Sequence, residues 1–278
     1  MLKPGSDTEL EKELRPKLLD EFSQHVLTGA MRVVRDEKNP IRLNLFAAAV
    51  RELYSHTLHL LAPDERVTKC SWYRLEPGTK GPTRAQRAKF ATQGGLSDEF
   101  IAEVGVDVEH LHRAAIDAIN ELNKFTHVRP GVIEPDKGKV ESFVSEALSA
   151  LIGLFESFAE CSEEVLHTLQ DAIDRAAVEA FVLETIPEVD ELATHHSVEE
   201  AYVEDMAITA VTETTVHFKL SGSLSVELQW GSNSDWRRGD GAKMRQSFPF
   251  EMTMQSSVDA LTNFDEVVFQ VDTSRWYQ

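Results

Sequence analysis

The chain has little cysteine, because Cys70 and Cys161 are the only two thiols in its 278 residues. So few cysteines exclude a disulfide-stapled scaffold, and no repeated Cys/His spacing indicates a zinc site. We also find no apolar run long enough to cross a bilayer and no basic-then-apolar signal segment. These absences predict a cytoplasmic protein with free thiols, no membrane contact, no metal and no other cofactor.

Positive charge is scarce as well, since 28 Lys/Arg stand against 47 Asp/Glu and give a formal net charge of −19. The acidic excess is concentrated in residues 131–204, which hold 18 acids and 3 bases. Residues 1–130 hold 19 of each, and residues 205–278 hold 10 acids and 6 bases. An acidic surface repels phosphate, so RNA or DNA is expected to bind the first or last third of the chain.

Hydrophobic periodicity predicts an α+β, multidomain fold. Apolar residues spaced three and four apart indicate helices over residues 14–34, 39–63, 83–92, 107–128 and 138–185. The last of these helices is expected to have a break near 161–162. From about residue 201 the period becomes two, which indicates strands over 206–211, 215–220, 224–230, 248–254 and 266–271. We therefore predict a helical bundle at 1–130, an acidic helical segment and linker at 131–200, and a small antiparallel β-domain at 201–278. A turn is expected at Ser221-Gly222-Ser223.

The predicted central helix carries a polar stripe beside its apolar one. Asn44, Arg51 and His59 belong to this stripe, with Ala48 and Ser55 between them at steps of three or four residues. A buried arginine needs a partner, so Arg51 forms either an internal salt bridge or part of a functional site. In the later helix Asn123 and His127 are one turn apart. His127 is either a site residue or a helix-end histidine stabilised by the dipole.

Two further segments combine basic residues with aromatic ones. Residues 64–90 hold seven Lys/Arg. The cations Arg84, Arg87 and Lys89 suit phosphate contact, and Trp72 suits base stacking. The alternative is a solvated loop whose Trp72 plugs the bundle.

Residues 231–241 form a predicted glycine-rich loop. Arg237 and Arg238 in this loop are predicted nucleic-acid contacts. The polar residues beside them suit ligand or partner binding, namely Ser232, Asn233, Asp235 and Asp240. The alternative is a connection that Asp235 and Asp240 hold by bonds to the backbone. His195 and His196 are adjacent, which makes them a weak metal pair.

Several stretches together resemble a family of bacterial predicted nucleases associated with prokaryotic PIWI-type proteins. The N-terminal resemblance lies in NPIRLNLFAAAVRELYSHTLHLLAPDERVTKCSWY (39–73), TRAQRAKFATQGGLSDEF (83–100) and LNKFTHVRP (122–130). The C-terminal resemblance lies in VELQWGSNSDWRRGDGAKMRQSFPFEM (226–252). The resemblance implies a nuclease effector in antiphage or plasmid defence, with a defence-system protein as a possible partner.

Residues 40–128 also resemble a HEPN bundle, the helical domain of many defence and toxin ribonucleases. The mark of that family is Arg, four to six residues, then His, which Arg51 and His56 match as R-ELYS-H. Glu52 departs from the Asn, Asp or His that usually follows the arginine. This resemblance implies metal-independent RNA cleavage and a homodimer, with His127 or His56 moving the 2′-hydroxyl proton, Arg51 holding the phosphate and Asn123 orienting either group.

Two other functions stay open from the sequence. One is a non-catalytic protein that senses nucleic acid or docks a partner through the β-domain. The other is a metal-dependent DNA nuclease, for which Asp235 to Lys243 is the only acid-rich loop with basic neighbours.

Overall fold

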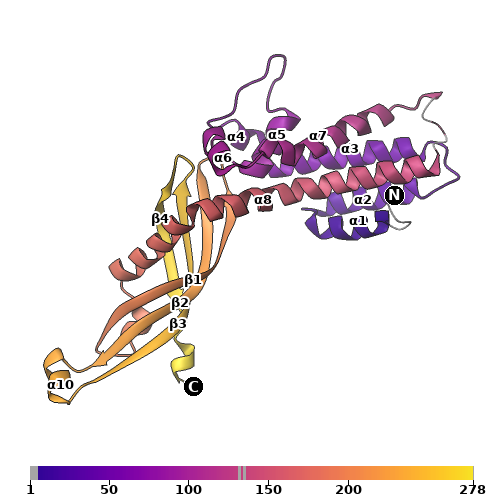
Figure 1. The fold of residues 1–278 in the computed structure, drawn as a ribbon. Coiled ribbons are helices and arrows are strands. Elements are labelled where there is room, and N and C mark those ends of the chain that lie inside the picture. Colours follow the sequence, from indigo (N-terminus) through magenta and orange to yellow (C-terminus); the bar gives the residue numbers. More distant parts are fainter. Residues whose placement is uncertain (1–5, 131–132, 134–135, 278) are drawn as a thin grey trace. The chain divides into compact units, whose positions relative to one another are not determined.

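A computed structural model describes residues 6–130, 133 and 136–277 of the chain. Contacts divide the chain into two compact units, residues 1–161 and residues 162–278. The predicted division at 130 and 200 differs from these units, because the first part of the acidic helix packs with the N-terminal helices. The chain is α+β, with helices in the first unit and a four-stranded antiparallel sheet in the second (Figure 1).

The first unit is built from helices that begin at well-defined caps. Thr83 closes a capping box with Gln86 at the start of α5, and Ser97 caps α6. Asp20 caps α2 and Asp107 caps α7. The elements are α1 (Ser6–Leu14), η1 (Arg15–Lys17), α2 (Glu21–Val34), α3 (Arg42–Leu61), α4 (Asp64–Val67), α5 (Arg84–Gln93), α6 (Asp98–Val104), α7 (Val108–Phe125) and the first part of α8 (Lys137–Leu183).

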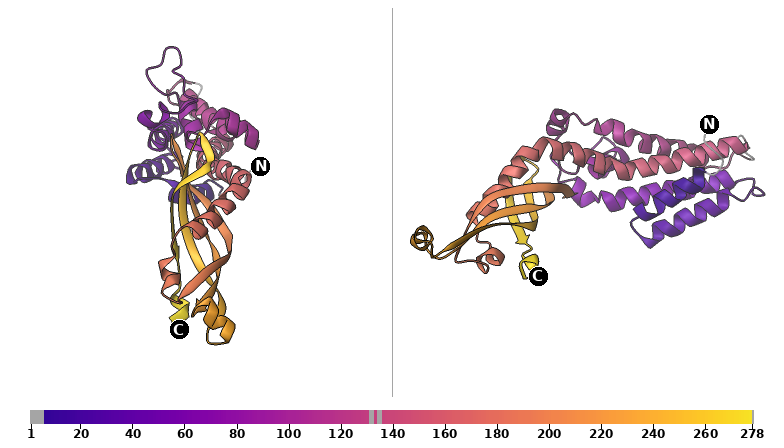
Figure 2. Two further views of the ribbon diagram at one scale, coloured as in Figure 1. Left: turned by 90° about the vertical axis from the view of Figure 1, so that its left-hand side faces the viewer. Right: turned by 60° about the horizontal axis from the view of Figure 1, so that its bottom comes forward.

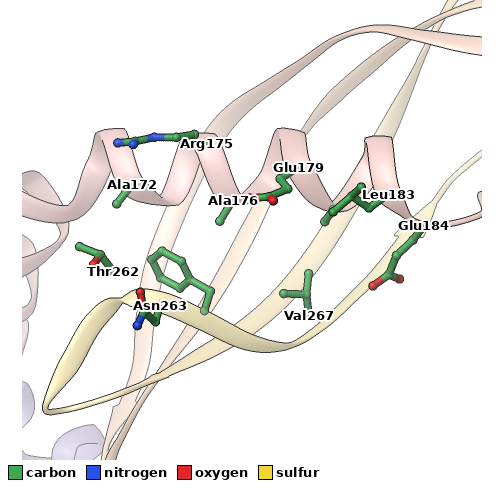
Figure 3. Close-up of a pocket in the computed structure, with 11 residues that line it drawn as sticks. Ala172, Arg175, Ala176, Glu179, Leu183, Glu184, Thr262, Asn263 and Val267 are labelled. Carbon is green, nitrogen blue, oxygen red and sulfur yellow. The ribbon is translucent and has the colours of Figure 1, made fainter.

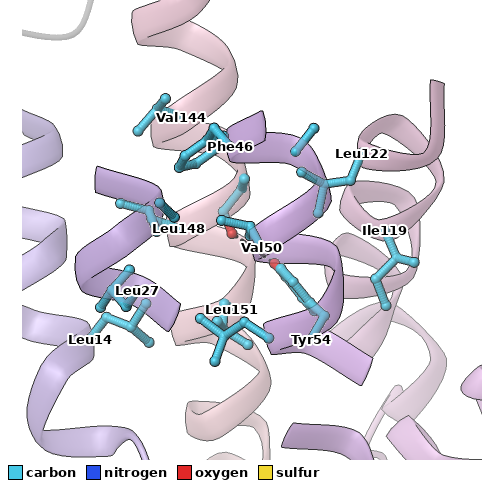
Figure 4. Packing of buried hydrophobic residues seen from close by; sticks show 14 of the residues in the cluster. Leu14, Leu27, Phe46, Val50, Tyr54, Ile119, Leu122, Val144, Leu148 and Leu151 are labelled. Carbon is cyan, nitrogen blue, oxygen red and sulfur yellow. Dashed lines mark hydrogen bonds between the residues drawn. The ribbon is translucent and has the colours of Figure 1, made fainter. Parts of the chain in front are cut away.

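The central helix predicted between Pro40 and Pro63 is confirmed as α3. Its buried face meets α2, α7 and the start of α8 in one apolar core (Figure 4). Tyr54 is fully buried there, and its hydroxyl donates a hydrogen bond of 2.7 Å to the carbonyl of Ala147. This bond gives the buried phenol the partner that it needs.

Three helix predictions differ from the structure. The helix predicted at 14–34 is broken, because Pro16 cannot continue an α-helix and a 3₁₀ turn separates α1 from α2. The helix predicted to end at Val128 ends at Phe125. No break occurs in α8 near Cys161.

The expected absence of a membrane-length apolar run needs a correction. Within the described residues, one helix segment, Gly138–Leu183 of α8, has the length and composition to cross a bilayer. Its 18-residue window has a mean hydropathy of 1.3, to which small residues contribute, and 44% of that window is buried. Core helices of soluble proteins pass the same test, and Val144, Leu148 and Leu151 of α8 lie in the core of the first unit.

The second unit is a sheet with the order β1-β2-β3-β4 and antiparallel neighbours. One face packs on the second part of α8, where Phe181 meets the rings of Phe250 and Phe269 at centroid distances of 4.9 and 4.6 Å. The views in Figures 1 and 2 place α10 at the end of the β2–β3 hairpin. The elements are α9 (Pro187–Asp190), β1 (His195–Val211), β2 (Thr215–Trp230), α10 (Asn233–Arg238), β3 (Ala242–Ser257), β4 (Ala260–Val271) and η3 (Ser274–Tyr277).

The turn predicted at Ser221-Gly222-Ser223 is wrong, because β2 continues through it. Gly222 lies opposite Val203 of β1 and Phe250 of β3. A Cβ at this position would meet the Tyr202 carbonyl oxygen at 2.0 Å, so the glycine permits a close strand approach. Ser221 and Ser223 occupy the polar face of the sheet, in the alternation of a half-buried strand.

Candidate functional site

Arg51 and His56, the two residues of the arginine–histidine motif, both lie on α3 and are both half-buried. His56 is five positions after Arg51, so their side chains point roughly 140° apart around the helix axis. Arg51 is half-buried, and its guanidinium pairs with the Glu52 carboxylate at 2.5 Å. Within one chain the motif therefore points Arg51 away from His56, whereas Glu52 lies one turn from His56 on the same face of the helix.

His56 has a carboxylate partner that the sequence did not indicate. Its Nε2 lies 2.6 Å from Oδ2 of Asp20, the N-cap of α2, and its ring meets Phe22 edge-on at 4.7 Å. Hydrogen bonds from Ser23 and His56 lower the pKa of Asp20 to about 2, so this carboxylate is ionised at neutral pH. The His56 side chain is 32% exposed.

Asn123 and His127 are at the C-terminal end of α7. His127 lies beyond the last helical residue and is exposed, and the Asn123 carbonyl accepts a bond from Thr126. The end of α7 is held by Asn44, whose Nδ2 donates to the Phe125 carbonyl at 2.8 Å and lies 3.5 Å from the His127 carbonyl.

Arg51 is seven residues beyond Asn44, about 10 Å further along the α3 axis. Joint action of Arg51 and His127, within one chain or across a dimer, stays a prediction.

Two of the four predicted nucleic-acid contacts in the basic segment have structural partners. Arg87 is 5% exposed, and its guanidinium donates to the Ala62 carbonyl and pairs with Asp64. The hydrogen bond from Arg87 lowers the pKa of Asp64. Trp72 donates to the Gly94 carbonyl at 3.0 Å and packs on a small core of Ala62, Val67, Cys70 and Phe90.

The other two, Arg84 and Lys89, differ in their exposure to solvent. Arg84 is exposed in the first turn of α5. Lys89 pairs with Asp98 at 2.6 Å and lies 4.6 Å from the centre of the Trp72 ring. The segment therefore leaves Arg84 as its accessible cation among the four predicted residues.

The glycine-rich loop predicted at 231–241 contains a helix. Ser232 and Asp235 form a capping box at the start of α10, which follows the alternative in which Asp235 holds the connection. Bonds from Ser232 and then from Arg238 lower the pKa of Asp235. Asp240 donates its backbone N–H to the Asp235 carbonyl at 2.9 Å. These bonds commit Asp235 to the backbone, which is a poor arrangement for a metal ligand.

A polar cleft of about 420 Å³ lies where β1, β2 and β3 meet α10. In the strand register His195, Gln229 and Lys243 form one row, and Ser197, Glu227 and Arg245 form the next row on the same face. The cleft is lined by His195, His196, Ser197, Glu227, Gln229, Ser232, Asn233 and Lys243. Two predicted binding residues, Ser232 and Asn233, thus meet a histidine and a lysine.

The side chains in the cleft are tied together by hydrogen bonds. Lys243 Nζ pairs with Glu227 at 2.5 Å, and Gln229 Nε2 donates to Asn233 Oδ1 at 3.1 Å. By strand alternation His196 faces the opposite side of the sheet from His195, where its Nδ1 lies 2.9 Å from Asp190. His195 is exposed and therefore the accessible imidazole of the two.

The same end of the sheet carries a basic and aromatic tip, which we define as Trp236, Arg237, Arg238, Lys243 and Arg245. These residues include four of the six Lys/Arg in residues 205–278. Trp236 is 50% exposed, and Lys243 Nζ lies 5.2 Å from the centre of its ring. Arg238 pairs with Asp235 at 2.8 Å, and Arg245 with Glu199 at 3.0 Å. An exposed ring among cations is the combination that stacks bases and holds phosphates.

Sequence reasoning missed Glu227 as a site residue. It considered Lys243 only as the end of an acid-rich loop for a metal-dependent nuclease, and His195 only as half of a metal pair. His195 and Glu227 are 32 positions apart in the sequence, and the pairing of β1 with β2 brings them into one cleft. Within the described parts of the chain, no three His, Cys, Asp or Glu side chains gather as ligands for one metal ion.

Comparison with known proteins gives the family of the chain. Models described as a predicted pPIWI-associating nuclease match residues 15–151 and residues 158–277. No curated protein and no solved structure matches significantly. Both matches name nuclease domains, which supports a nuclease-like function and binding of nucleic acid. The chain belongs to the family of predicted pPIWI-associating nucleases.

Proposed function

We propose that this protein is a ribonuclease effector of bacterial defence, and that it binds and cleaves RNA at the polar cleft and the basic and aromatic tip. The observation that carries the proposal is the row of His195, Gln229 and Lys243 beside Trp236. A proton acceptor, a phosphate-binding cation and a base-stacking ring lie at one end of one sheet. The family supports a nuclease, and this arrangement supports the choice of RNA.

Electrostatics favour this end of the second unit for a polyanion. Residues 162–204 are strongly acidic, whereas Arg237, Arg238, Lys243 and Arg245 gather around α10. Three of these cations pair with Asp235, Glu227 and Glu199, so a phosphate backbone is repelled less at the tip than along the acidic segment and can replace these carboxylates as the partner of the cations. Trp236 offers a stacking surface that accepts any base, which favours single-stranded substrate of mixed sequence.

Histidine chemistry explains why RNA is the preferred substrate. His195 takes the proton of the 2′-hydroxyl, and the 2′-oxygen forms a bond to phosphorus while the bond from phosphorus to the 5′-oxygen breaks. The 5′-oxygen takes a proton from water, and His195 returns its proton to the hydroxide that remains. The products are a 2′,3′-cyclic phosphate and a 5′-hydroxyl. Lys243 leaves its ion pair with Glu227 and stabilises the negative charge that grows on the phosphate. DNA has no 2′-hydroxyl and is not cleaved by this route.

A second location for the same chemistry is the first unit. The bond of 2.6 Å between His56 and Asp20 fixes the imidazole as a catalytic carboxylate would, and Arg51 is half-exposed on the same helix. In this alternative Arg51 holds the phosphate, while His56 or His127 moves the proton and Asn123 orients one of them. We prefer the cleft at His195 for two reasons. Glu52 stands where the HEPN motif usually has Asn, Asp or His, and the side chains of Arg51 and His56 point roughly 140° apart.

The test uses the purified full chain with end-labelled single-stranded RNA, and DNA of the same sequence, in buffer with EDTA. We expect RNA cleavage with cyclic phosphate ends, and a loss of about 100-fold or more in His195→Ala and Lys243→Ala. His25→Ala, a change of the exposed imidazole on α2, is the matched control and keeps full activity. Loss in Arg51→Ala and His56→Ala with full activity in His195→Ala moves the site to α3. Absence of RNA cleavage, or cleavage of DNA that requires Mg²⁺, refutes the proposal.

A further inference from the structure

A second cleft, of about 750 Å³, lies within the second unit between α8 and β4. Figure 3 shows Ala176, Glu179 and Leu183 of the helix on one side, and Asn263 and Val267 of the strand on the other. No residue of the proposed catalytic cleft lines it.

The strand that borders this cleft is an edge of the sheet. β4 pairs with β3 along one side, from Ala260 opposite Ser257 to Val271 opposite Phe250. In the described sheet no strand pairs with the other side of β4, because β4 is last in the order β1-β2-β3-β4. An edge strand presents backbone N–H and carbonyl groups that can pair with an added strand.

The cleft has apolar surface and room for side chains. Leu183 is 74% exposed and lines the cleft beside the half-buried Phe264 and Val267. Ala172, Ala176 and Ala180 stand one turn apart on the facing side of α8, and their short side chains leave space above the strand. Alternate apolar side chains of an added strand would reach this space, since they all point to one face of the sheet.

Charge around the cleft is mostly negative. Glu179 and Glu184 line it with a single base, Arg175. Asp171 of α8 and Asp265 and Glu266 of β4 are exposed on the same two elements. Burial and the neighbouring Asp171 raise the pKa of Asp174, which shows how closely the acids of the helix are spaced.

We propose that this cleft binds an extended segment of a partner protein, which pairs with the free edge of β4 as a fifth strand. The segment carries alternating β-branched or aromatic residues for the cleft and Lys or Arg for the acidic rim. Main-chain bonds to the edge supply affinity, and the alternate side chains supply selectivity.

The acidic rim also argues against a second copy of the chain as the occupant. Pairing of two β4 edges would bring the carboxylates of Asp265 and Glu266 in one copy against acids of the other, and like charges opposite each other destabilise a sheet. The same acids attract a basic segment and repel a nucleic acid.

The first experiment selects linear 12-residue peptides from a phage-displayed library on the immobilised full chain. The double variant Glu179→Lys/Glu184→Lys serves for counter-selection. We expect enriched peptides with alternating β-branched or aromatic residues, at least two Lys or Arg, and no proline at the centre. Absence of enrichment, or enrichment without this alternation, refutes the proposal.

The second experiment measures the affinity of the most enriched peptide by fluorescence anisotropy. We expect at least tenfold weaker binding to Glu179→Lys/Glu184→Lys than to Glu163→Lys/Glu164→Lys, which makes the same charge change at exposed positions of α8 outside the cleft. A peptide with proline at two central positions should not bind.

Equal affinity for both double variants would indicate non-specific charge attraction and refute the proposal. Self-association of the full chain that is lost in Glu179→Lys/Glu184→Lys would make a second copy the occupant, and also refutes it. RNA cleavage is unchanged in both double variants, so failure of this proposal is distinguishable from failure of the nuclease proposal.

Discussion

Replacement of Arg87 by alanine separates a structural role of this residue from a role in nucleic-acid binding. Its basic neighbourhood in the sequence suits phosphate contact, but the guanidinium is 5% exposed and bonded to the Ala62 carbonyl and to Asp64. Ala62 is itself fully buried at the end of α3, so its carbonyl loses its partner in the variant. We therefore expect Arg87→Ala to destabilise the helical unit and to leave nucleic-acid binding unchanged in the folded protein.

The magnitude follows from the lost contacts. A hydrogen bond from a charged group contributes about 1.5–3 kcal/mol, and a buried carbonyl without a partner costs about 1–3 kcal/mol. The Asp64 side chain is 57% exposed, so solvent screens its ion pair and we give that pair little weight. Both figures describe one lost contact and are not added in full, so we take a loss of about 3 kcal/mol, which lowers the Tm of this unit by roughly 6–12 °C.

The assay is differential scanning calorimetry of the full chain with RNA-binding titrations on the folded variants. Arg84→Ala is the matched control, since it removes an exposed arginine from the same helix and should change stability by less than about 0.5 kcal/mol. A variant Arg87→Ala that keeps the wild-type Tm and loses RNA affinity would refute the structural role.

Three other predictions follow from single positions. Gly222→Ala places a Cβ 2.0 Å from the Tyr202 carbonyl oxygen, so we expect a loss of roughly 3 kcal/mol or more in the β-unit, measured by urea unfolding; a wild-type midpoint would contradict this close approach. Hydrogen bonds from Ser23 and His56 lower the pKa of Asp20 from 3.8 to about 2. The stabilisation from these bonds is therefore present above pH about 4 and is lost as the pH falls towards 2. An NMR titration of Asp20 with a midpoint near 4 in the native protein would contradict these hydrogen bonds. Burial raises the pKa of Cys161 to about 12, and we expect its thiol to resist Ellman's reagent at pH 8 in the native state and to react fully in urea, with fast native labelling as the contrary result.

The sequence predicted the elements whose signals are local. Pro40 and Pro63 bound α3, and Thr83 caps the helix that was expected over residues 83–92. The change of apolar period near residue 201 predicted the antiparallel sheet, although the strands extend well beyond the expected bounds. Strand ends depend on pairing with a neighbour, which a single strand does not encode.

The candidate site could be predicted only in part. Ser232, Asn233, Arg237 and Arg238 stood out because glycine, polar and basic residues gather in one short stretch. His195 and Glu227 are unremarkable in sequence, and only the register of β1 with β2 brings them to one cleft. The bond between His56 and Asp20 likewise joins residues 36 positions apart.

The sequence by itself determined the division into helical and sheet regions, the family, and the acidic character of the middle of the chain. The division and the acidic character depend on composition and on periodicity along neighbouring residues, and the family rests on the resemblance of whole stretches. Only the tertiary structure decided that Arg87 and Trp72 have partners inside the fold, while Lys243 meets Trp236 at the end of the sheet. The physical reason is that burial and charge pairing depend on residues far apart in the chain, and a cationic side chain has the same identity in a core as in a binding site.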